Sequence, residues 1–390
     1  MATDRTNTRR PATSSGRPSA GRRGATPNRT NGQGNMSATR KARKKKKRIA
    51  LFVLEIMVLL LLVVVLYAVL KAENIQKISI NEEDIIFNET VKQNDSLKGY
   101  RNIALFGVDS REGALGKGTR SDTIMIASIN EDTGEVKLCS VYRDTYLNLG
   151  NDTYNKCNSA YAKGGPEQAI NMLNMNLDLN ITDYVTIGFD GLMEVIDALG
   201  GVYVDVTEAE IPHLNNYQIS IVGTSTDGKT FTATEGVDYI AVTTPGYQKL
   251  NGLQATAYCR IRHVGDDFMR AQRQRTVLSE IMKEAKNVSP TKLNTILDSV
   301  LPNVSTSLDL DEMVAILGDL SKYNIVGSDG FPFESNRATG KVGAKGSCVI
   351  PNTLADNVVM LHQYFFDDEE YAVSADLQKY SDKISADTGY

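Results

Sequence analysis

The pattern of apolar positions separates one long, uninterrupted segment from the rest of the chain. Residues 49–70 are apolar apart from Glu55. At about 1.5 Å per residue, a helix of this length spans roughly 33 Å, which is enough to cross the core of a bilayer. A buried helix of a soluble protein is rarely this long or this apolar. Because no Ala-x-Ala type of cleavage site follows, the pattern predicts an uncleaved transmembrane signal-anchor.

Beyond this segment, short apolar runs alternate with stretches of helical periodicity. Strands are predicted where apolar runs are bounded by turn residues, at 102–108, 123–129, 135–142, 184–189 and 202–206. Helices are predicted at 158–177, 191–199, 267–286, 291–301 and 309–317. The first of these helices contains a break at Gly164-Gly165-Pro166, and Asp267 is available as the N-cap of the third.

Two further segments combine both kinds of pattern. Residues 253–262 are predicted to run from a short helix into a strand, and residues 331–366 through a strand and a loop into a helix. The alternation of strands and helices predicts an α/β fold, namely a single-domain α/β/α sandwich with a central mixed sheet.

Charge is divided unevenly, although the net charge at pH 7 is only −4. Residues 1–48 hold 15 Lys and Arg and one acidic residue, whereas residues 71–390 hold 28 basic and 45 acidic residues. The basic run 40–48 directly precedes the apolar segment, and such positive flanks stay in the cytoplasm. We therefore expect a disordered cytoplasmic tail at 1–48, the membrane helix at 49–70 and an acidic extracellular part, with membrane lipid as one partner.

The extracellular part is expected to have four segments. They are a polar stalk at 71–100, a principal domain at 101–288, helices and strands packed on it at 289–370, and a tail at 371–390. Its acidity excludes a uniformly basic nucleic-acid binder. The basic tail is consistent with contact to anionic lipid or nucleic acid, but a topology signal explains it more simply.

Residue counts exclude several common kinds of site. Three well-separated His make a multi-histidine metal site improbable, and no Cys-x-x-Cys pair is present. Gly-x-Ser-x-Gly, Walker and Gly-x-Gly-x-x-Gly motifs are also absent from the sequence. An extracellular location permits disulfides, and four Cys allow three pairings among which the sequence does not choose. The four cysteines are Cys139, Cys157, Cys259 and Cys348.

Charged residues gather instead where predicted strands begin or end. Asp109 follows the first strand, Arg120 and Asp122 open the second, and Arg143 and Asp144 end the third. Arg260 and Arg262 are two positions apart in a predicted strand, so their side chains are expected on one face. Arg270, Arg273 and Gln274 are spaced to share one face of a helix.

This combination suits phosphate chemistry. The planar fork of arginine matches phosphate oxygens two at a time, and two carboxylates beside phosphates suit Mg²⁺ or Mn²⁺. Phosphoryl transfer depends mainly on positioning and neutralisation, so it needs no Ser or His nucleophile. Taken singly, each motif is more often a turn, a cap or a surface ion pair. Their convergence favours a metal-assisted site for a pyrophosphate or phosphodiester.

The same motifs, in this order, resemble the LytR-CpsA-Psr family of Gram-positive cell-wall enzymes over about residues 101–288. The matching blocks are 106–111, 120–123, 140–145, 161–165, 197–201, 250–252, 260–262 and 267–274. The basic tail, single membrane span and external domain also match the family layout. Tyr142 and Met269 depart from the residues usual in the family, Pro and Gly, and are expected to reshape the rim of the site.

The resemblance implies a phosphotransferase that moves a glycopolymer, such as wall teichoic acid or capsule, from a polyprenyl-pyrophosphate carrier to peptidoglycan. The implied acceptor is commonly the 6-hydroxyl of muramic acid, and polyprenyl phosphate is released. The resemblance also implies an apolar groove for the lipid between sheet and helices, around segments such as 170–177 and 192–199. Those segments are equally consistent with plain core packing.

The resemblance assigns roles to individual residues. Asp109 and Asp122 match metal-associated carboxylates, and Arg143, Arg260, Arg262 and Asp122 are the expected catalytic residues. Pyrophosphate contacts are expected from Arg120, Arg143, Arg260, Arg262, Asp267, Arg270 and Gln274. Arg273 lies in the same block but is also consistent with a structural ion pair. Two alternatives remain open, a hydrolase of lipid pyrophosphates and a non-enzymatic regulator of the cell envelope.

Overall fold

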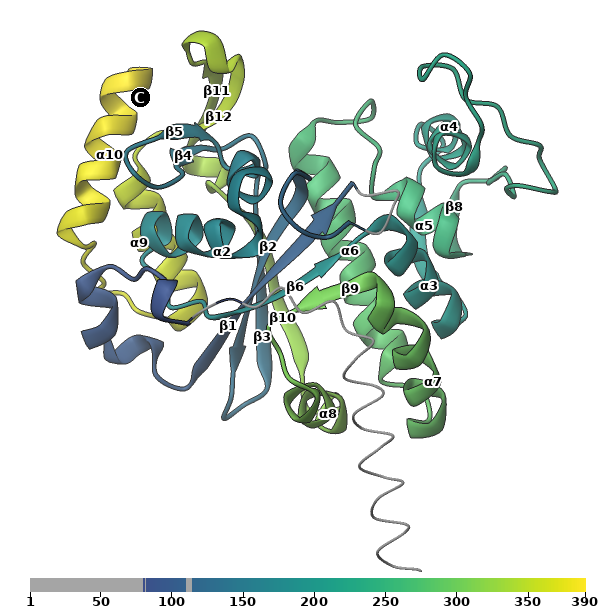
Figure 1. The fold of residues 1–390 in the computed structure, drawn as a ribbon, viewed down its shortest axis with the longest axis horizontal. Helices are drawn as coiled ribbons and strands as arrows, with labels where there is room; N and C mark the ends of the chain where they lie inside the picture. Colours follow the sequence, from purple (N-terminus) through teal and green to yellow (C-terminus); the bar gives the residue numbers. More distant parts are fainter. Residues whose placement is uncertain (1–79, 81, 110–113) are drawn as a thin grey trace, which may run out of the picture. The chain divides into compact units, whose positions relative to one another are not determined.

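The computed structural model describes residues 80, 82–109 and 114–390 (Figure 1). The basic tail and the membrane helix expected at 49–70 lie outside these residues, as do Ser110 and Arg111 of the first matching block. Within the described part of the chain, no helix has both the length and the apolar character needed to cross a membrane.

Six strands form the central sheet, in the order β10-β3-β2-β1-β6-β9. Their bounds are β1 Tyr100–Val108, β2 Ser121–Asn130, β3 Glu135–Val141, β6 Asp183–Ile187, β9 Val304–Thr306 and β10 Asn324–Phe331. Strand β1 is antiparallel to β2 and parallel to β6, whereas β3 is antiparallel to β2 and parallel to β10. The sheet is therefore mixed, as the alternation of elements predicted.

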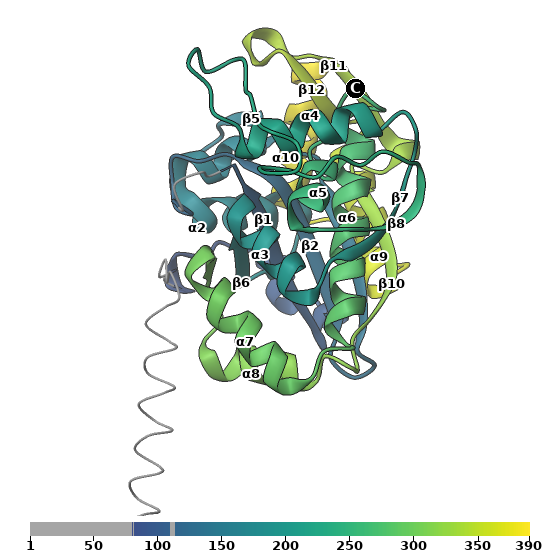
Figure 2. The same cartoon turned by 90° about the vertical axis from the view of Figure 1, so that its right-hand side faces the viewer.

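Helices cover both faces of this sheet (Figures 1 and 2). One face carries α2 (Asn158–Leu177), α9 (Leu354–Phe366) and α10 (Ala375–Thr388). The other carries α3 (Phe189–Leu199), α5 (Gly252–Tyr258), α6 (Asp267–Ala285) and α7 (Pro290–Val300). Helix α8 (Leu310–Gly318) precedes β10, and α4 (Ile211–Val222) packs against α5. Strands β7 (Val202–Val206) and β8 (Gly246–Leu250) form a separate two-stranded sheet, and β7 lies next to α6 (Figure 2).

The larger core lies between the sheet and α2, α9 and α10. Phe106 of β1, Tyr161 and Ile170 of α2 and Phe365 of α9 are fully or almost fully buried in it. Helix α2 has the predicted break, because Gly165 adopts φ +72°, a left-handed conformation that glycine tolerates without a side-chain clash. The segment 170–177 is buried in this core, so the expectation that it borders an open groove is wrong.

The predicted strand through Arg260 and Arg262 is also wrong. Asn251 and Gln254 form a reciprocal capping box that starts α5, and the helix continues to Tyr258. Arg260 and Ile261 then donate backbone hydrogen bonds to Ala257 and Tyr258, which closes a tight turn. The apolar alternation around Cys259 thus reflects a buried turn, and the two arginines reach the site from a loop.

The start of α6 differs by one residue from the prediction. The side chain of Asp266, not of Asp267, accepts hydrogen bonds from the backbone N–H groups of Phe268 and Met269. Asp266 is therefore the N-cap. This leaves the carboxylate of Asp267 available to the arginines next to it.

The two ends of the described chain pack more extensively than expected. Short 3₁₀ turns within the predicted stalk bury Ile85, Val91 and Leu97 in the large core. In the predicted tail, α10 buries Leu377 and Ile384. Strands β9 and β10, both beyond residue 288, complete the two edges of the central sheet.

Two short hairpins complete the fold. The pair β4 (Tyr146–Asn148) and β5 (Tyr154–Lys156) follows the end of β3. The pair β11 (Arg337–Lys341) and β12 (Ser347–Pro351) follows β10. A backbone bridge joins Thr145 to Val349, so the two hairpins meet beside the end of β3.

Candidate active site

Charged residues from separate elements meet at one edge of the central sheet. Strand β1 ends there at Val108, which pairs with Ser121 at the start of β2, so Asp109 and Asp122 are brought to the same edge. Strand β3 ends at the same edge and is followed by Arg143. The loop after α5 and the first turns of α6 supply the remaining charged groups.

Asp122 is the centre of this cluster. Its Oδ1 accepts a hydrogen bond from Arg143 Nη1 at 2.6 Å. Its Oδ2 lies 3.5 Å from Arg262 Nη2 and 3.5 Å from Arg270 Nη2. The structure therefore brings three of the predicted arginines to one carboxylate.

A second layer of charges surrounds Arg143. Asp267 Oδ1 lies 3.5 Å from Arg270 Nη1 and 4.0 Å from Arg143 Nε, and Asp144 Oδ1 lies 3.7 Å from the same Nε. Burial opposes the charged form of Arg143, but Asp122, Asp144 and Asp267 together raise its pKa above the usual value. The guanidinium is thus firmly cationic while only 19% exposed.

Lys156 is a site residue that the sequence analysis missed. Its Nζ donates to Asp144 Oδ2 at 3.1 Å, which places an additional cation beside Arg143. The hairpin of β4 and β5 brings Lys156 back to Tyr146, just after the end of β3. The only signal in the sequence was the short apolar alternation after Arg143.

The cluster leaves buried donors without acceptors. Neither Arg143 Nε nor Arg270 Nε has a hydrogen-bond partner among the described residues, and the Arg270 side chain is 5% exposed. Burial lowers the pKa of Arg270, and the nearby Arg262 and Arg143 add to that effect against the pull of Asp122. Buried donors left unpaired are costly, so the arrangement favours an incoming anion with several oxygen acceptors.

Arg260 enters the site from a different direction. Its guanidinium lies over the rings of Phe189 and Tyr217, at 4.5 and 5.5 Å from their centroids. Its Nη2 is 3.8 Å from Asp109 Oδ2. Cation–π contacts with these two rings hold the guanidinium in place beside Asp109.

Two arginines do not join the cluster: Arg120, an expected pyrophosphate contact, and Arg273, which was equally consistent with a structural pair. Arg120 precedes β2 and is exposed, and it has no ion pair with any described carboxylate. Arg273 is buried elsewhere, where its Nε donates to Glu210 Oε1 at 2.6 Å. This confirms the structural reading of Arg273. Gln274 does reach the site, since it lines the adjoining cavity and donates to Cys259 O at 3.3 Å.

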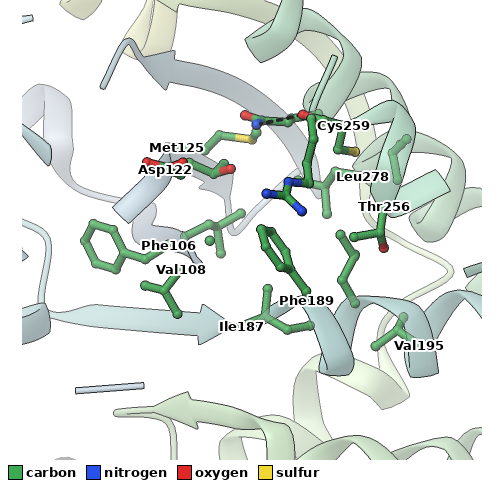
Figure 3. A pocket seen from close by; sticks show the side chains of 18 of the residues that line it. Phe106, Val108, Asp122, Met125, Ile187, Phe189, Val195, Thr256, Cys259 and Leu278 are labelled. Atoms are coloured by element: carbon green, nitrogen blue, oxygen red, sulfur yellow. Dashed lines mark hydrogen bonds between the residues drawn. The ribbon is translucent and has the colours of Figure 1, made fainter. Parts of the chain in front are cut away.

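A cavity of about 240 Å³ adjoins the charged cluster. Figure 3 shows Asp122 and Met125 extending from β2, Phe189 and Val195 from α3, and Thr256 and Cys259 beside them. Strand β2 and helix α6 each pass from charged to apolar residues along the cavity, ending at Leu278 and Ile281 on α6. The cavity therefore has a cationic mouth and an apolar interior. The predicted segment 192–199 borders it through Leu192 and Val195.

The cysteines carry neither disulfides nor nucleophilic chemistry. All four are buried and unpaired in the described structure. Burial raises the pKa of Cys259, which lines the cavity, to about 12, and Cys157 is shifted in the same direction. A thiol so raised stays protonated at neutral pH and is a poor nucleophile.

The carboxylates fit one mode of metal binding. The described residues contain no group of three His, Cys, Asp or Glu side chains that would enclose an ion. Asp109 and Asp122 follow paired strand ends and offer two carboxylates, so an ion held there would also need substrate phosphates and water as ligands, which is usual for Mg²⁺. An ion held in this way depends on the phosphate ligand.

Comparisons with known proteins find one family of relatives. A model of the LytR_cpsA_psr family matches residues 62–345. Similar curated proteins include "Polyisoprenyl-teichoic acid--peptidoglycan teichoic acid transferase TagU" of Oceanobacillus iheyensis, 34% identical over 59% of this chain and 64% of that protein. TagU of Bacillus subtilis is 31% identical over 63% of this chain and 70% of the TagU chain. The match thus spans slightly less than two thirds of the first relative.

Solved structures share the fold. The crystal structure described as a transcriptional regulator from Enterococcus faecalis is 27% identical and superposes with a TM-score of 0.55, covering 76% of this chain and 98% of that one. The structure described as "TagT bound to LIIa-WTA" is 21% identical, with a TM-score of 0.51 over 76% of this chain and 94% of that one. At that identity the second likeness concerns the fold alone.

Proposed function

The chain belongs to the LytR_cpsA_psr family, and from this premise we propose that it is a glycopolymer phosphotransferase. It moves a glycopolymer such as teichoic acid from a polyprenyl-pyrophosphate carrier to peptidoglycan. The observation that carries the proposal is the junction between Asp122 with its three arginines and the apolar cavity. A lipid pyrophosphate has the same two parts, an anionic head and an apolar chain. The names of the curated relatives point to the same donor and acceptor.

The proposed reaction exchanges one phosphoester bond for another. The acceptor hydroxyl oxygen bonds to the phosphorus that carries the glycan, and the bond from that phosphorus to the bridging oxygen breaks. Polyprenyl phosphate leaves with the bridging oxygen, and the product is a sugar–peptidoglycan phosphodiester. The hydroxyl proton passes to a carboxylate of the pair Asp109 and Asp122.

The arginines have separable tasks in this scheme. Arg143, Arg262 and Arg270 converge on Asp122 and would bind the pyrophosphate oxygens, with Nε of Arg143 and of Arg270 as donors that lack protein partners. Arg260, held by Phe189, would neutralise charge on the transferred phosphoryl group. Lys156 pairs with Asp144, which follows Arg143 in the chain, and so adds positive charge close to the cluster. Preorganised charge of this kind lowers the barrier, because no groups must reorient during the reaction.

The proposal includes a divalent ion and a location. Asp109 and Asp122 would hold Mg²⁺ or Mn²⁺, which would neutralise pyrophosphate oxygens as the leaving group departs. The site would lie outside the cell, next to the membrane that contains the lipid donor, with the chain anchored through residues 49–70 and its amino terminus in the cytoplasm.

The test uses the full chain purified in detergent. It is incubated with a synthetic polyprenyl-pyrophosphate oligosaccharide, Mg²⁺ and peptidoglycan oligomers, and the products are followed by mass spectrometry. An adduct joined by a phosphodiester, absent with Arg260→Ala, is the expected result. Free oligosaccharide phosphate in place of the adduct would show a hydrolase. Absence of both products with teichoic-acid and capsule precursors would refute the proposal.

A further inference from the structure

The segment after β10 makes direct contact with the loop that carries Arg143. Tyr142 donates its backbone N–H to Phe331 O at 3.0 Å, and Val349 donates its backbone N–H to Asp144 O at 2.9 Å. The residues on both sides of Arg143 are therefore bonded to a part of the chain about 200 positions away. No such tie was expected from the sequence, which left the role of residues 289–390 open.

Side chains reinforce this connection. The guanidinium of Arg337 lies 3.8 Å from the ring centroid of Phe268 and 5.1 Å from that of Tyr142, and its Nη1 donates to the Tyr142 hydroxyl at 3.2 Å. The two rings pack edge to face, with centroids 4.5 Å apart. We call Arg337, Tyr142 and Phe268 the aromatic bracket.

The bracket is built into the fold rather than resting on its surface. Gly330 lies under the Tyr142 ring, and a side chain at that position would overlap its hydroxyl. Tyr142 and Phe268 pack with Ala271 and Val349 in a small cluster of their own. Among the described residues, no carboxylate lies within ion-pair distance of Arg337. Its charge therefore engages aromatic faces and neutral oxygens, not an ordinary surface salt bridge.

The position of the bracket determines what it can do. Tyr142 is adjacent to Arg143, and Phe268 lies between Asp267 and Arg270 on α6. Arg337 thus connects the two elements whose charged groups meet at Asp122. Displacing reacting groups by about 1 Å can cost about a hundredfold in rate.

We infer that Arg337 is a positioning residue for the proposed transfer reaction. Through its contacts with Tyr142 and Phe268, it fixes the position of the Arg143 loop relative to the start of α6. The inference rests on the proposed function for its catalytic consequence. The structural part of the inference does not depend on that function: it says that Arg337 protects the backbone of residues 142–146 from local opening. The two parts are therefore tested separately.

The experiment compares Arg337→Gln, Arg337→Lys and Arg101→Gln in the full chain. Arg101 is a matched control, because it is a partly buried arginine on β1 that pairs with Asp183 and Glu312. Transfer kinetics, thermal midpoints and amide hydrogen exchange of the peptide 142–146 are measured for each. Gly330→Ala, which displaces Tyr142 while retaining Arg337, provides a second route to the same perturbation.

For Arg337→Gln we expect kcat to fall about tenfold while KM changes less than threefold, and exchange over 142–146 to rise about tenfold. Arg337→Lys should recover part of both, because an ammonium group retains the attraction to the rings. Gly330→Ala should show the same lower kcat and faster exchange over 142–146 as Arg337→Gln. Arg101→Gln should keep the kcat and the exchange rate of the wild type.

Unchanged kcat and unchanged exchange in Arg337→Gln would overturn the inference, as would an equal loss in Arg101→Gln. Faster exchange with normal kcat would also overturn the catalytic role. If the wild type itself transfers nothing, the proposed function fails. Faster exchange in Arg337→Gln would in that case still support the structural part.

Discussion

Two arginines one turn apart on α6 are almost equally buried but have different surroundings. Arg273 is 2% exposed and all three of its nitrogen positions are used, since they donate to Glu210 Oε1, Ile261 O and Val264 O at 2.6, 3.1 and 2.6 Å. Arg270 is 5% exposed, and its Nη2 lies 3.5 Å from Asp122 Oδ2, a carboxylate that it shares with Arg143 and Arg262. Its Nε has no hydrogen-bond partner among the described residues.

The difference separates a structural arginine from a functional one. The protein satisfies Arg273 completely, so that residue has little capacity left for a ligand. The cluster around Arg270 has more guanidinium donors than its carboxylates accept, which is unfavourable until an anion binds. Burial alone does not distinguish the two, whereas the count of satisfied donors does.

The largest effect on activity is expected from removing one of the arginines that share Asp122. Arg143→Ala should lower kcat/KM for glycopolymer transfer by about a thousandfold, roughly 4 kcal/mol, because it deletes a donor aimed at the transferred phosphates. The thermal midpoint should change little, since Asp122 keeps Arg262 and Arg270 as partners. Steady-state kinetics and calorimetry on the same preparation measure both.

A loss of less than tenfold for Arg143→Ala would contradict the functional assignment of the cluster. A large drop in thermal midpoint would contradict it as well, because Arg143 would then resemble Arg273. Arg120→Ala is the matched control, since Arg120 is exposed and outside the cluster.

The complementary change concerns the buried ion pair of Arg273 and Glu210, which we call the satisfied pair because all three nitrogen positions of Arg273 donate hydrogen bonds. Arg273→Met should destabilise the fold by about 3 kcal/mol, because Glu210 is then a buried carboxylate without its partner. The double variant Arg273→Met with Glu210→Leu should lose less than the sum of the single variants. Urea unfolding followed by circular dichroism measures the three free energies. Additive losses would show that the two residues do not act as a pair.

The central sheet was largely predictable from local patterns. Strands β1, β2, β3 and β6 lie within about two residues of their predicted bounds, because alternation of apolar residues and the turn residues around it are local signals. Strand ends indicated that Asp122 and Arg143 lie near one another, whereas the site role of Arg270 was implied by the family resemblance, since helix spacing alone did not distinguish it from Arg273. Sequence patterns alone also left Arg273 with two possible roles, because its partner Glu210 is 63 positions away.

Long-range contacts account for what the sequence did not predict. Arg337 bonds to a tyrosine 195 positions away, and nothing near residue 337 signals that contact. Lys156 enters the site only because a short hairpin returns it to Tyr146. The prediction of a strand through Arg260 was wrong because a buried turn and a buried strand show similar apolar alternation over a few residues.

A smaller effect should follow from altering the shared carboxylate. In the absence of metal, Asp122→Asn should bind inorganic pyrophosphate about fivefold more tightly, because an anion no longer competes for Arg143, Arg262 and Arg270. The same variant should lose the gain in affinity that Mg²⁺ gives the wild type. Isothermal titration calorimetry with and without EDTA measures both quantities.

Glu210→Gln is the matched control for that experiment. It alters the carboxylate of the satisfied pair, so it should weaken stability and leave pyrophosphate affinity unchanged. Equal pyrophosphate affinity for Asp122→Asn and the wild type would show that the carboxylate does not hold the arginines for a ligand.

The smallest effect is expected where aromatic rings hold an arginine. Phe189→Leu should weaken inorganic pyrophosphate binding about threefold, because Arg260 loses one of its two ring contacts, a loss of roughly 0.6 kcal/mol. Inorganic pyrophosphate has no lipid chain, so its affinity reports on Arg260 and not on the apolar lining to which Phe189 also contributes. Tyr258→Leu removes the ring 5.8 Å from the Arg273 guanidinium and should leave that affinity unchanged. If both variants weakened binding equally, the loss could not be attributed to Arg260, and the difference between the site arginines and Arg273 would not extend to their aromatic partners.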